Sequence, residues 1–244
     1  MADLDWLITR PLAHRGLHDE QNGIMENTLS AFAAAVAASY GIECDLQISS
    51  DGEAMVYHDD VLGRVSDGKG RLDALTAAEL KRVAFKGTAD RMMTLGELCD
   101  FVASRVTLLL ELKSSLASDR RLATRAAKVL SGYGGQAAVM SFDPALIADL
   151  RSMAPRLTHG IAVRNPAWAE ITATPRRALA GLLQALRARP QFLAYSIANL
   201  PAPLPTLART LFGLPLLAWT VRSTDDQRKA ARYADQMIFE GFRP

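Results

Sequence analysis

Short apolar runs alternate with stretches of helical periodicity along the whole chain. In the helical stretches apolar residues recur every three to four positions, and two stretches begin with a capping-box pattern, Thr followed three residues later by Glu. Helices are therefore predicted at 29–39, 76 to about 85, 94–103, 118–130, 144–153, 178–187, near 207 and at 224–234. The apolar runs predict nine strands, at 11–13, 42–46, 54–57, 106–112, 137–142, 159–163, 192–196, 216–221 and 237–239.

This alternation continues from end to end without a linker or a low-complexity tract. It predicts one α/β domain over residues 1–244 with a mostly parallel sheet. The 244 residues match the length of a TIM (β/α)8 barrel, which is typically about 250 residues. Nine candidate strands exceed the eight of a barrel. The extra strand lies either at the Asp51-Gly52 turn or at the C-terminus, and the pattern leaves both open.

The stretch from residue 42 to residue 59 carries the densest polar pattern. Two extended runs are joined at Asp51-Gly52, a dipeptide that favours a tight reversal of the chain. Glu43 and Asp45 lie two residues apart, so their carboxylates project from one face of the strand. The second run ends at His58. This stretch predicts a metal site beside a group that transfers protons.

Composition and charge narrow the class of protein. Hydrophobic residues make up 49% of the chain and charged residues 22%, as in an ordinary globular protein. The formal net charge of +2 is too small, and the basic residues too scattered, to indicate nucleic-acid binding. A mildly basic surface would not repel an anionic substrate.

The compartment is predicted from the cysteines and from the N-terminus. Cys44 and Cys99 lie within apolar patterns and are interpreted as buried free thiols, which are typical of a reducing compartment. The N-terminus carries acidic residues where a signal peptide would have basic ones. The apolar tract at 200–221 is interrupted by prolines and arginines, so no membrane insertion is expected. A cytoplasmic protein is the expectation.

Polar side chains gather where the predicted strands end, which is where the sites of α/β barrels lie. They are His14, Arg15, Glu43, Asp45, His58, Asp59, Glu111 and Lys113. Three carboxylates suit a hard cation, Mg²⁺ or Ca²⁺, better than zinc. A cation, an arginine and a lysine together would bind a phosphate, with the two histidines as general acid and base.

Each feature has an ordinary structural explanation when it is taken alone. A carboxylate pair on a strand is more often a solvated face, and Trp219 is more often a core residue than a wall of a binding site. Glu111 is the most informative residue, because an ionised group inside the apolar run VTLLLEL needs a partner. The hypothesis rests on these features occurring together in one barrel.

As an ordered set, the short motifs resemble the glycerophosphodiester phosphodiesterase family over nearly the whole chain. The motifs are AHRG at 13–16, ENT at 26–28, ECDLQ at 43–47, DGEAMVYHDD at 51–60, LLLELK at 108–113, SFD at 141–143 and AWTV at 218–221. The resemblance implies a somewhat distorted TIM barrel that hydrolyses glycerophosphodiesters to glycerol 3-phosphate and an alcohol with a divalent cation. The substrate is then a small molecule.

The resemblance also implies roles for individual residues. By matching position, the metal ligands are Glu43, Asp45 and Glu111. His14 and His58 are the acid–base pair. Arg15 and Lys113 hold the phosphate, with Glu26 close to the site and Trp219 in the substrate pocket.

Three departures from the family pattern fall outside this set. Arg222 stands where the family usually has asparagine, and Phe239-Glu240 stands where it has threonine-aspartate. The loop after His58-Asp59 reads DVLGR where the family more often has a threonine and a second aspartate. These differences concern the pocket of the leaving group more than the reaction.

Three other functions remain open at this point. The same site could act on lysophospholipids in the manner of a lysophospholipase D, with the Pro-rich tract at 200–217 lining an entrance for an acyl chain, although a barrel-closing helix is the better reading of that tract. It could also form a cyclic phosphate, or bind phosphodiesters without cleaving them. The head group, the choice between Mg²⁺ and Ca²⁺, the separate roles of the two histidines and the oligomeric state are not determined by the sequence.

Overall fold

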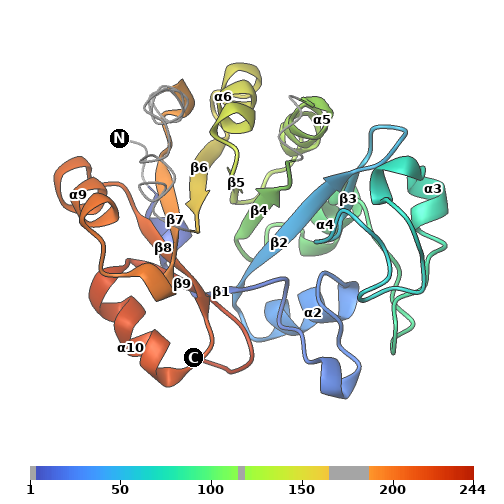
Figure 1. Cartoon of the computed structure of the whole chain (residues 1–244), viewed down its shortest axis with the longest axis horizontal. Coiled ribbons are helices and arrows are strands. Elements are labelled where there is room, and N and C mark those ends of the chain that lie inside the picture. The colour runs from blue at the N-terminus through green and yellow to red at the C-terminus, as the bar shows by residue number, and fades with distance from the viewer. Residues whose placement is uncertain (1–3, 115–118, 165–186) are drawn as a thin grey trace, which may run out of the picture.

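Eight parallel strands close into a barrel in the computed structural model, which describes residues 4–114, 119–164 and 187–244 (Figure 1). The barrel strands are β1 (Leu12–Ala13), β2 (Gly41–Ile48), β4 (Leu108–Leu112), β5 (Ala137–Ser141), β6 (Thr158–Val163), β7 (Phe192–Ser196), β8 (Leu216–Val221) and β9 (Gln236–Phe239). Strand β1 pairs in parallel with β2 on one side and with β9 on the other, which closes the barrel. The predicted TIM barrel is therefore confirmed.

One of the nine predicted strands, the third along the chain, lies outside the barrel. Strand β3 (Ala54–Val56) pairs antiparallel with the end of β2, and the two form the hairpin that turns at Asp51-Gly52. Gly52 has a φ of 85°, a left-handed conformation that glycine adopts without steric cost. The extra strand is thus the one at this turn, and the C-terminal run is the eighth strand of the barrel.

Helices cover the outside of the barrel where the periodicity predicted them. The described helices are α1 (Asp5–Ile8), α2 (Leu29–Ala37), α3 (Ala77–Leu80), α4 (Leu95–Val102), α5 (Arg121–Leu130), α6 (Pro144–Met153), α9 (Pro203–Phe212) and α10 (Thr224–Tyr233), with short 3-10 turns η1 (Glu20–Asn22), η2 (Leu72–Ala74) and η3 (Ile197–Asn199). The two predicted capping boxes are present, at Thr76 with Glu79 and at Thr94 with Glu97. The helix predicted at 178–187 lies almost wholly outside the described residues.

The predicted helix at 76–85 is shorter than expected. It ends at Leu80, and the chain continues through turns to an antiparallel bridge between Phe85 and Ser66. Phe85 is buried against the Tyr57 ring, with the ring centroids 6.1 Å apart. This small core beneath the loops that follow β3 takes the chain out of the helix after one turn.

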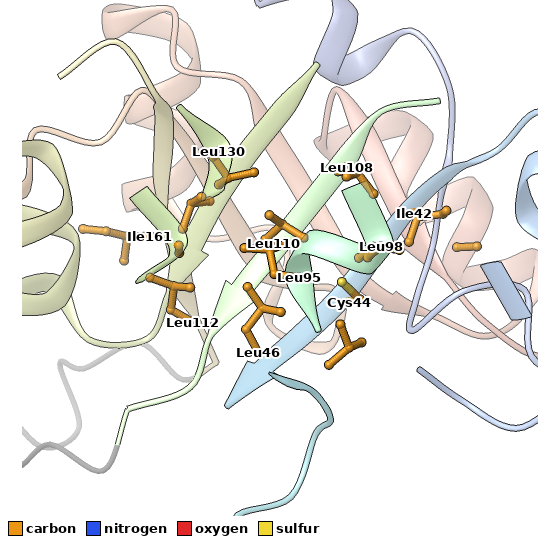
Figure 2. Close-up of a cluster of buried hydrophobic side chains, with 14 of the residues drawn as sticks. Ile42, Cys44, Leu46, Leu95, Leu98, Leu108, Leu110, Leu112, Leu130 and Ile161 are labelled. Carbon is orange, nitrogen blue, oxygen red and sulfur yellow. The ribbon is translucent and has the colours of Figure 1, made fainter. Parts of the chain in front are cut away.

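Alternation along the strands separates two apolar layers. On β4, Leu108, Leu110 and Leu112 point outwards and pack against the helices, in the cluster that Figure 2 shows together with Ile42, Cys44 and Leu46 of β2. Leu109, one residue out of phase, packs inside the barrel. Side chains at successive strand positions face opposite sides, so Glu111 must point inwards with Leu109. The same alternation turns Glu43 and Asp45 of β2 into the barrel.

Two further expectations were a barrel-closing helix in the Pro-rich tract and the absence of a membrane-spanning segment. Helix α9 does not close the barrel, because Pro205 is its one buried residue and its apolar side chains Leu204, Leu207, Leu211 and Phe212 are exposed. Among the described residues, no helix is both long and apolar enough to cross a membrane.

Candidate active site

Three carboxylates from two neighbouring strands meet inside the mouth of the barrel. Glu43 and Asp45 come from β2, and Glu111 of β4 pairs in register with Asp45. One ligand oxygen of each lies within 4.8 Å of the other two. All three side chains are buried, and Glu43 Oε1 has no hydrogen-bond partner. Three buried anions this close together need positive charge nearby.

The pKa values of the three carboxylates do not shift in the same direction. Burial raises the pKa of Glu43 well above its usual value, and the neighbouring charges of Asp45 and Glu111 raise it further. Burial also raises the pKa of Glu111, against the opposing effect of Lys113. Burial acts in the same direction on Asp45, but the positive charges of Lys113 and Arg15 outweigh it and lower that pKa. The cationic side chains thus balance the negative charge of Asp45 but balance the charges of Glu43 and Glu111 only in part.

Lys113 is one of the two cations. Its Nζ lies 2.8 Å from Asp45 Oδ1 and 2.5 Å from Glu111 Oε1. Burial would lower the pKa of the ammonium group, yet the two carboxylates raise it, so Lys113 is charged. The ammonium group touches two of the three carboxylates and leaves Glu43 Oε1 unpaired.

Arg15 is the second cation and follows β1 directly. Its φ of 57° lies in the left-handed region, and this conformation lets its backbone N–H donate to Glu43 Oε2 at 3.1 Å. Its guanidinium donates to Glu26 at 2.9 Å, and its Nε lies 3.3 Å from Asp45 Oδ2. Asn27 donates to the same Asp45 oxygen at 2.9 Å. Arg15 is therefore fixed between the carboxylates and Glu26.

His14 lines the cavity beside these groups. Its Nδ1 is hydrogen-bonded to Glu240 at the end of β9, and its Nε2 faces Glu43 at 3.9 Å. The other oxygen of Glu240 accepts a hydrogen bond from Arg222 Nε at 2.6 Å. A carboxylate on Nδ1 fixes the ring orientation and leaves Nε2 free to exchange a proton.

His58 is held in the same way. Its Nδ1 lies 2.6 Å from Asp59 Oδ1, and Arg64 Nε donates to the other Asp59 oxygen at 2.7 Å. Arg64 also donates two hydrogen bonds to Glu26, at 2.9 and 2.6 Å. Burial is the main effect on His58 and lowers its pKa. A continuous chain of charges thus runs from His58 through Arg64 and Glu26 to Arg15.

A cavity of about 330 Å³ opens above these groups. The predicted site residues His14, Arg15, Glu43, His58, Glu111, Lys113 and Trp219 line it. Asp45 lies beneath Lys113, and Glu26 lies behind Arg15. No residue between 200 and 217 is among the residues that line this cavity.

The donor set fits a hard divalent cation. Three carboxylates offer oxygen ligands, and Glu43 Oε1 is buried without a hydrogen-bond partner. No cysteine or histidine joins the cluster of possible ligands that the described residues form, which disfavours zinc. The under-compensated charge on Glu43 and Glu111 favours the same conclusion.

Four residues of the site were assigned no catalytic, binding or metal role from the sequence: Asn27, Asp59, Arg64 and Glu240. Thr28 is the N-cap of α2, and the side chain of Asn27 beside it donates to Asp45 instead. The sequence did contain a signal for Asp59, because its carboxylate directly follows His58 in the chain. Glu240 was named only as a departure from the family pattern, and no local signal could connect it with His14, from which it lies 226 residues away.

The chain is similar to known proteins over nearly its whole length. The sequence profile of the Glycerophosphoryl diester phosphodiesterase family matches residues 14–240. A glycerophosphodiester phosphodiesterase of Caldanaerobacter subterraneus is 30% identical over 163 residues, which are 63% of this chain and 66% of that protein. The chain therefore aligns with slightly less than two thirds of that relative. The human glycerophosphodiester phosphodiesterase 1 is 39% identical over 74 residues, 30% of this chain and 21% of the human protein.

Solved structures share the fold. A glycerophosphodiester phosphodiesterase from Thermotoga maritima superposes with a TM-score of 0.69 at 24% identity, covering 93% of this chain and 92% of that one. A phosphodiesterase from Oleispira antarctica, in complex with the product sn-glycerol-3-phosphate, gives a TM-score of 0.76 at 21% identity, covering 95% and 93%.

Proposed function

The chain belongs to the glycerophosphoryl diester phosphodiesterase family of enzymes, and on that premise we propose that it hydrolyses glycerophosphodiesters to sn-glycerol 3-phosphate and an alcohol with the help of one divalent cation. The observation that carries this proposal is the buried carboxylate cluster, in which Glu43 Oε1 has no partner, beside Lys113 and Arg15. The product bound to the Oleispira antarctica phosphodiesterase is of the same chemical class.

Each cluster of side chains has a distinct part in the proposed reaction. Glu43, Asp45 and Glu111 would hold Mg²⁺ or Ca²⁺, which when bound neutralises charge on the phosphate oxygens. Arg15 and Lys113 bind the same phosphate, and the negative charge that builds on it in the transition state strengthens both contacts.

The two histidines move the protons. One of His14 and His58 takes a proton from the nucleophile, which is water or the glycerol hydroxyl of the substrate. The oxygen of the nucleophile forms a bond to phosphorus as the bond between phosphorus and the leaving oxygen breaks, and the other histidine protonates that leaving oxygen. If the glycerol hydroxyl is the nucleophile, water then opens the cyclic phosphate to give glycerol 3-phosphate. Glu240 and Asp59 keep the rings oriented through their Nδ1 atoms. Glu26 acts indirectly, because it holds Arg15 in place rather than contacting the phosphate.

The test is the release of glycerol 3-phosphate from a panel of glycerophosphodiesters, with EDTA and after Mg²⁺ or Ca²⁺ is added back. We expect EDTA to abolish release and one of the two cations to restore it. If neither cation gives release, the proposed reaction is refuted. Full activity in EDTA would refute the requirement for a divalent cation. A cyclic phosphate among the products would show that the glycerol hydroxyl is the nucleophile.

A further inference from the structure

An arginine and two aromatic rings form part of the wall of the cavity that the proposed phosphate-binding groups also line. Arg164 follows β6, Trp219 lies on β8 and Phe142 follows β5, and all three line the cavity. The guanidinium carbon of Arg164 lies 5.7 Å from the centroid of each ring. The rings contact each other edge to face, with their centroids 5.3 Å apart. This wall, defined by Arg164, Trp219 and Phe142, is called the arginine wall.

Within the part of the chain that the structure describes, no carboxylate balances the positive charge of the arginine wall. Each of the other cationic side chains on the cavity lining is paired: Arg15 with Glu26, Lys113 with Glu111, and Arg222 with Glu240. Among residues 4–114, 119–164 and 187–244, no acidic side chain lies within ion-pair distance of Arg164. A second negative charge on the substrate would therefore find its counter-charge here.

The same wall is unsuited to a cationic head group. Aromatic faces attract cations such as quaternary ammonium groups, and Trp219 is the strongest type of ring for that purpose. Here the guanidinium of Arg164 already lies over the Trp219 and Phe142 rings, so it occupies the favourable place and repels a second cation. Its planar group remains able to donate paired hydrogen bonds to a carboxylate or a phosphate.

From this geometry we infer that the enzyme prefers glycerophosphodiesters whose leaving alcohol carries a further negative charge, a carboxylate or a phosphate, and that Arg164 binds that charge. The inference rests on the proposed hydrolysis and names its substrate class. A charge-assisted contact of this kind gives a preference of about tenfold or more in kcat/KM over a neutral leaving group.

The test uses glycerol 3-phosphate esters that differ in one functional group. The leaving alcohols are 3-aminopropanol, 1,3-propanediol, 3-hydroxypropanoate and the monophosphate of 1,3-propanediol, which span cationic, neutral and anionic groups on one three-carbon chain. We expect both anionic esters to be hydrolysed at least tenfold more efficiently than the cationic one. The relative rates of the carboxylate and phosphate esters show which anion fits better.

Two substitutions identify Arg164 as the cause of the preference. Arg164→Gln should lower kcat/KM for the anionic esters at least tenfold more than for the neutral ester, and Arg164→Glu should reverse the order in favour of the amine. Arg71→Gln, which removes an exposed arginine that pairs with Asp60 and Asp73 and does not line the cavity, is the matched control and should leave the order unchanged.

The outcomes separate this inference from the proposed function. Equal hydrolysis of all four esters, or the same order in Arg164→Gln as in the native chain, would overturn the inference and leave the hydrolase standing. Absence of hydrolysis for every ester would refute the proposed function. In that case the affinities of the esters, followed by quenching of tryptophan fluorescence, still decide the inference, because the anionic esters must bind more tightly and lose that advantage in Arg164→Gln.

Discussion

Replacing Glu43 by glutamine should stabilise the protein without a divalent cation and destabilise it relative to the native chain with one. At a separation of 4.8 Å, two carboxylates repel each other by about 3.5 kcal/mol at an effective dielectric constant of about 20. Glutamine removes this repulsion, its oxygen can still accept from the Arg15 N–H, and its amide can donate to a neighbouring carboxylate. Lost attraction to Lys113 offsets part of the gain, which leaves a net stabilisation of about 2 kcal/mol.

That gain depends on pH in a definite direction. The pKa of Glu43 in the folded protein lies well above its usual value of 4.5, because burial and its acidic neighbours disfavour the anion. The folded protein therefore holds this proton more tightly than the unfolded chain, and stability without a cation is lost as pH rises from about 4.5 through the raised pKa. The advantage of Glu43→Gln should accordingly grow with pH over the same window.

The assay is thermal unfolding in EDTA and with an added cation. For a chain of this length, about 2 kcal/mol corresponds to a rise in Tm of about 4–8 °C in EDTA. A cation at about 100 times its Kd stabilises the native chain by about 2.7 kcal/mol, and the variant should lose most of that gain. The order of the two Tm values should therefore invert when Mg²⁺ or Ca²⁺ is added.

Glu53→Gln is the matched control, because it makes the same change in net charge at a surface pair with Arg125. Its effect should stay within about 1 kcal/mol and should not depend on the cation. A Glu43→Gln protein that is less stable than the native chain in EDTA would refute the reasoning, since the carboxylates would then not be under repulsion.

Three further predictions concern individual side chains. His14→Ala and His58→Ala should each lower kcat by about 10²-fold or more, and near-normal turnover in both would remove them from the proton transfers. Glu240→Gln should lower kcat by about tenfold or more with little change in KM, because it loosens the ring of His14 without touching the phosphate; a change in KM alone would contradict this positioning role. Burial raises the pKa of Cys99 from 9.0 to about 11, so at pH 8 its thiolate fraction and its rate of alkylation should be about 100-fold below those of the unfolded chain, and mass spectrometry of iodoacetamide-treated protein measures this. Equal rates of labelling in folded and unfolded protein would show that the thiol is accessible.

Local sequence patterns determined most of the elements and the inward carboxylates. All nine predicted strands are present, because each apolar run has its own period and its own flanking turn residues. Alternation within VTLLLEL is a property of any strand, so it was sufficient to turn Glu111 to the face opposite Leu110. The capping boxes at Thr76 and Thr94 are equally local, because their hydrogen bonds span three residues.

Tertiary structure decided what depends on strand pairing across the barrel. Whether β3 or the C-terminal run was the extra strand depended on the closure of β1 against β9, which no local pattern encodes. The contact of His14 with Glu240 and the packing of Arg164 over the Trp219 ring join residues far apart in the chain. The predicted length of α3 was wrong for the same reason, because the bridge between Phe85 and Ser66 competes with helical hydrogen bonds. The sequence by itself determined which groups point into the barrel, and the register and closure of the strands determined which of them meet.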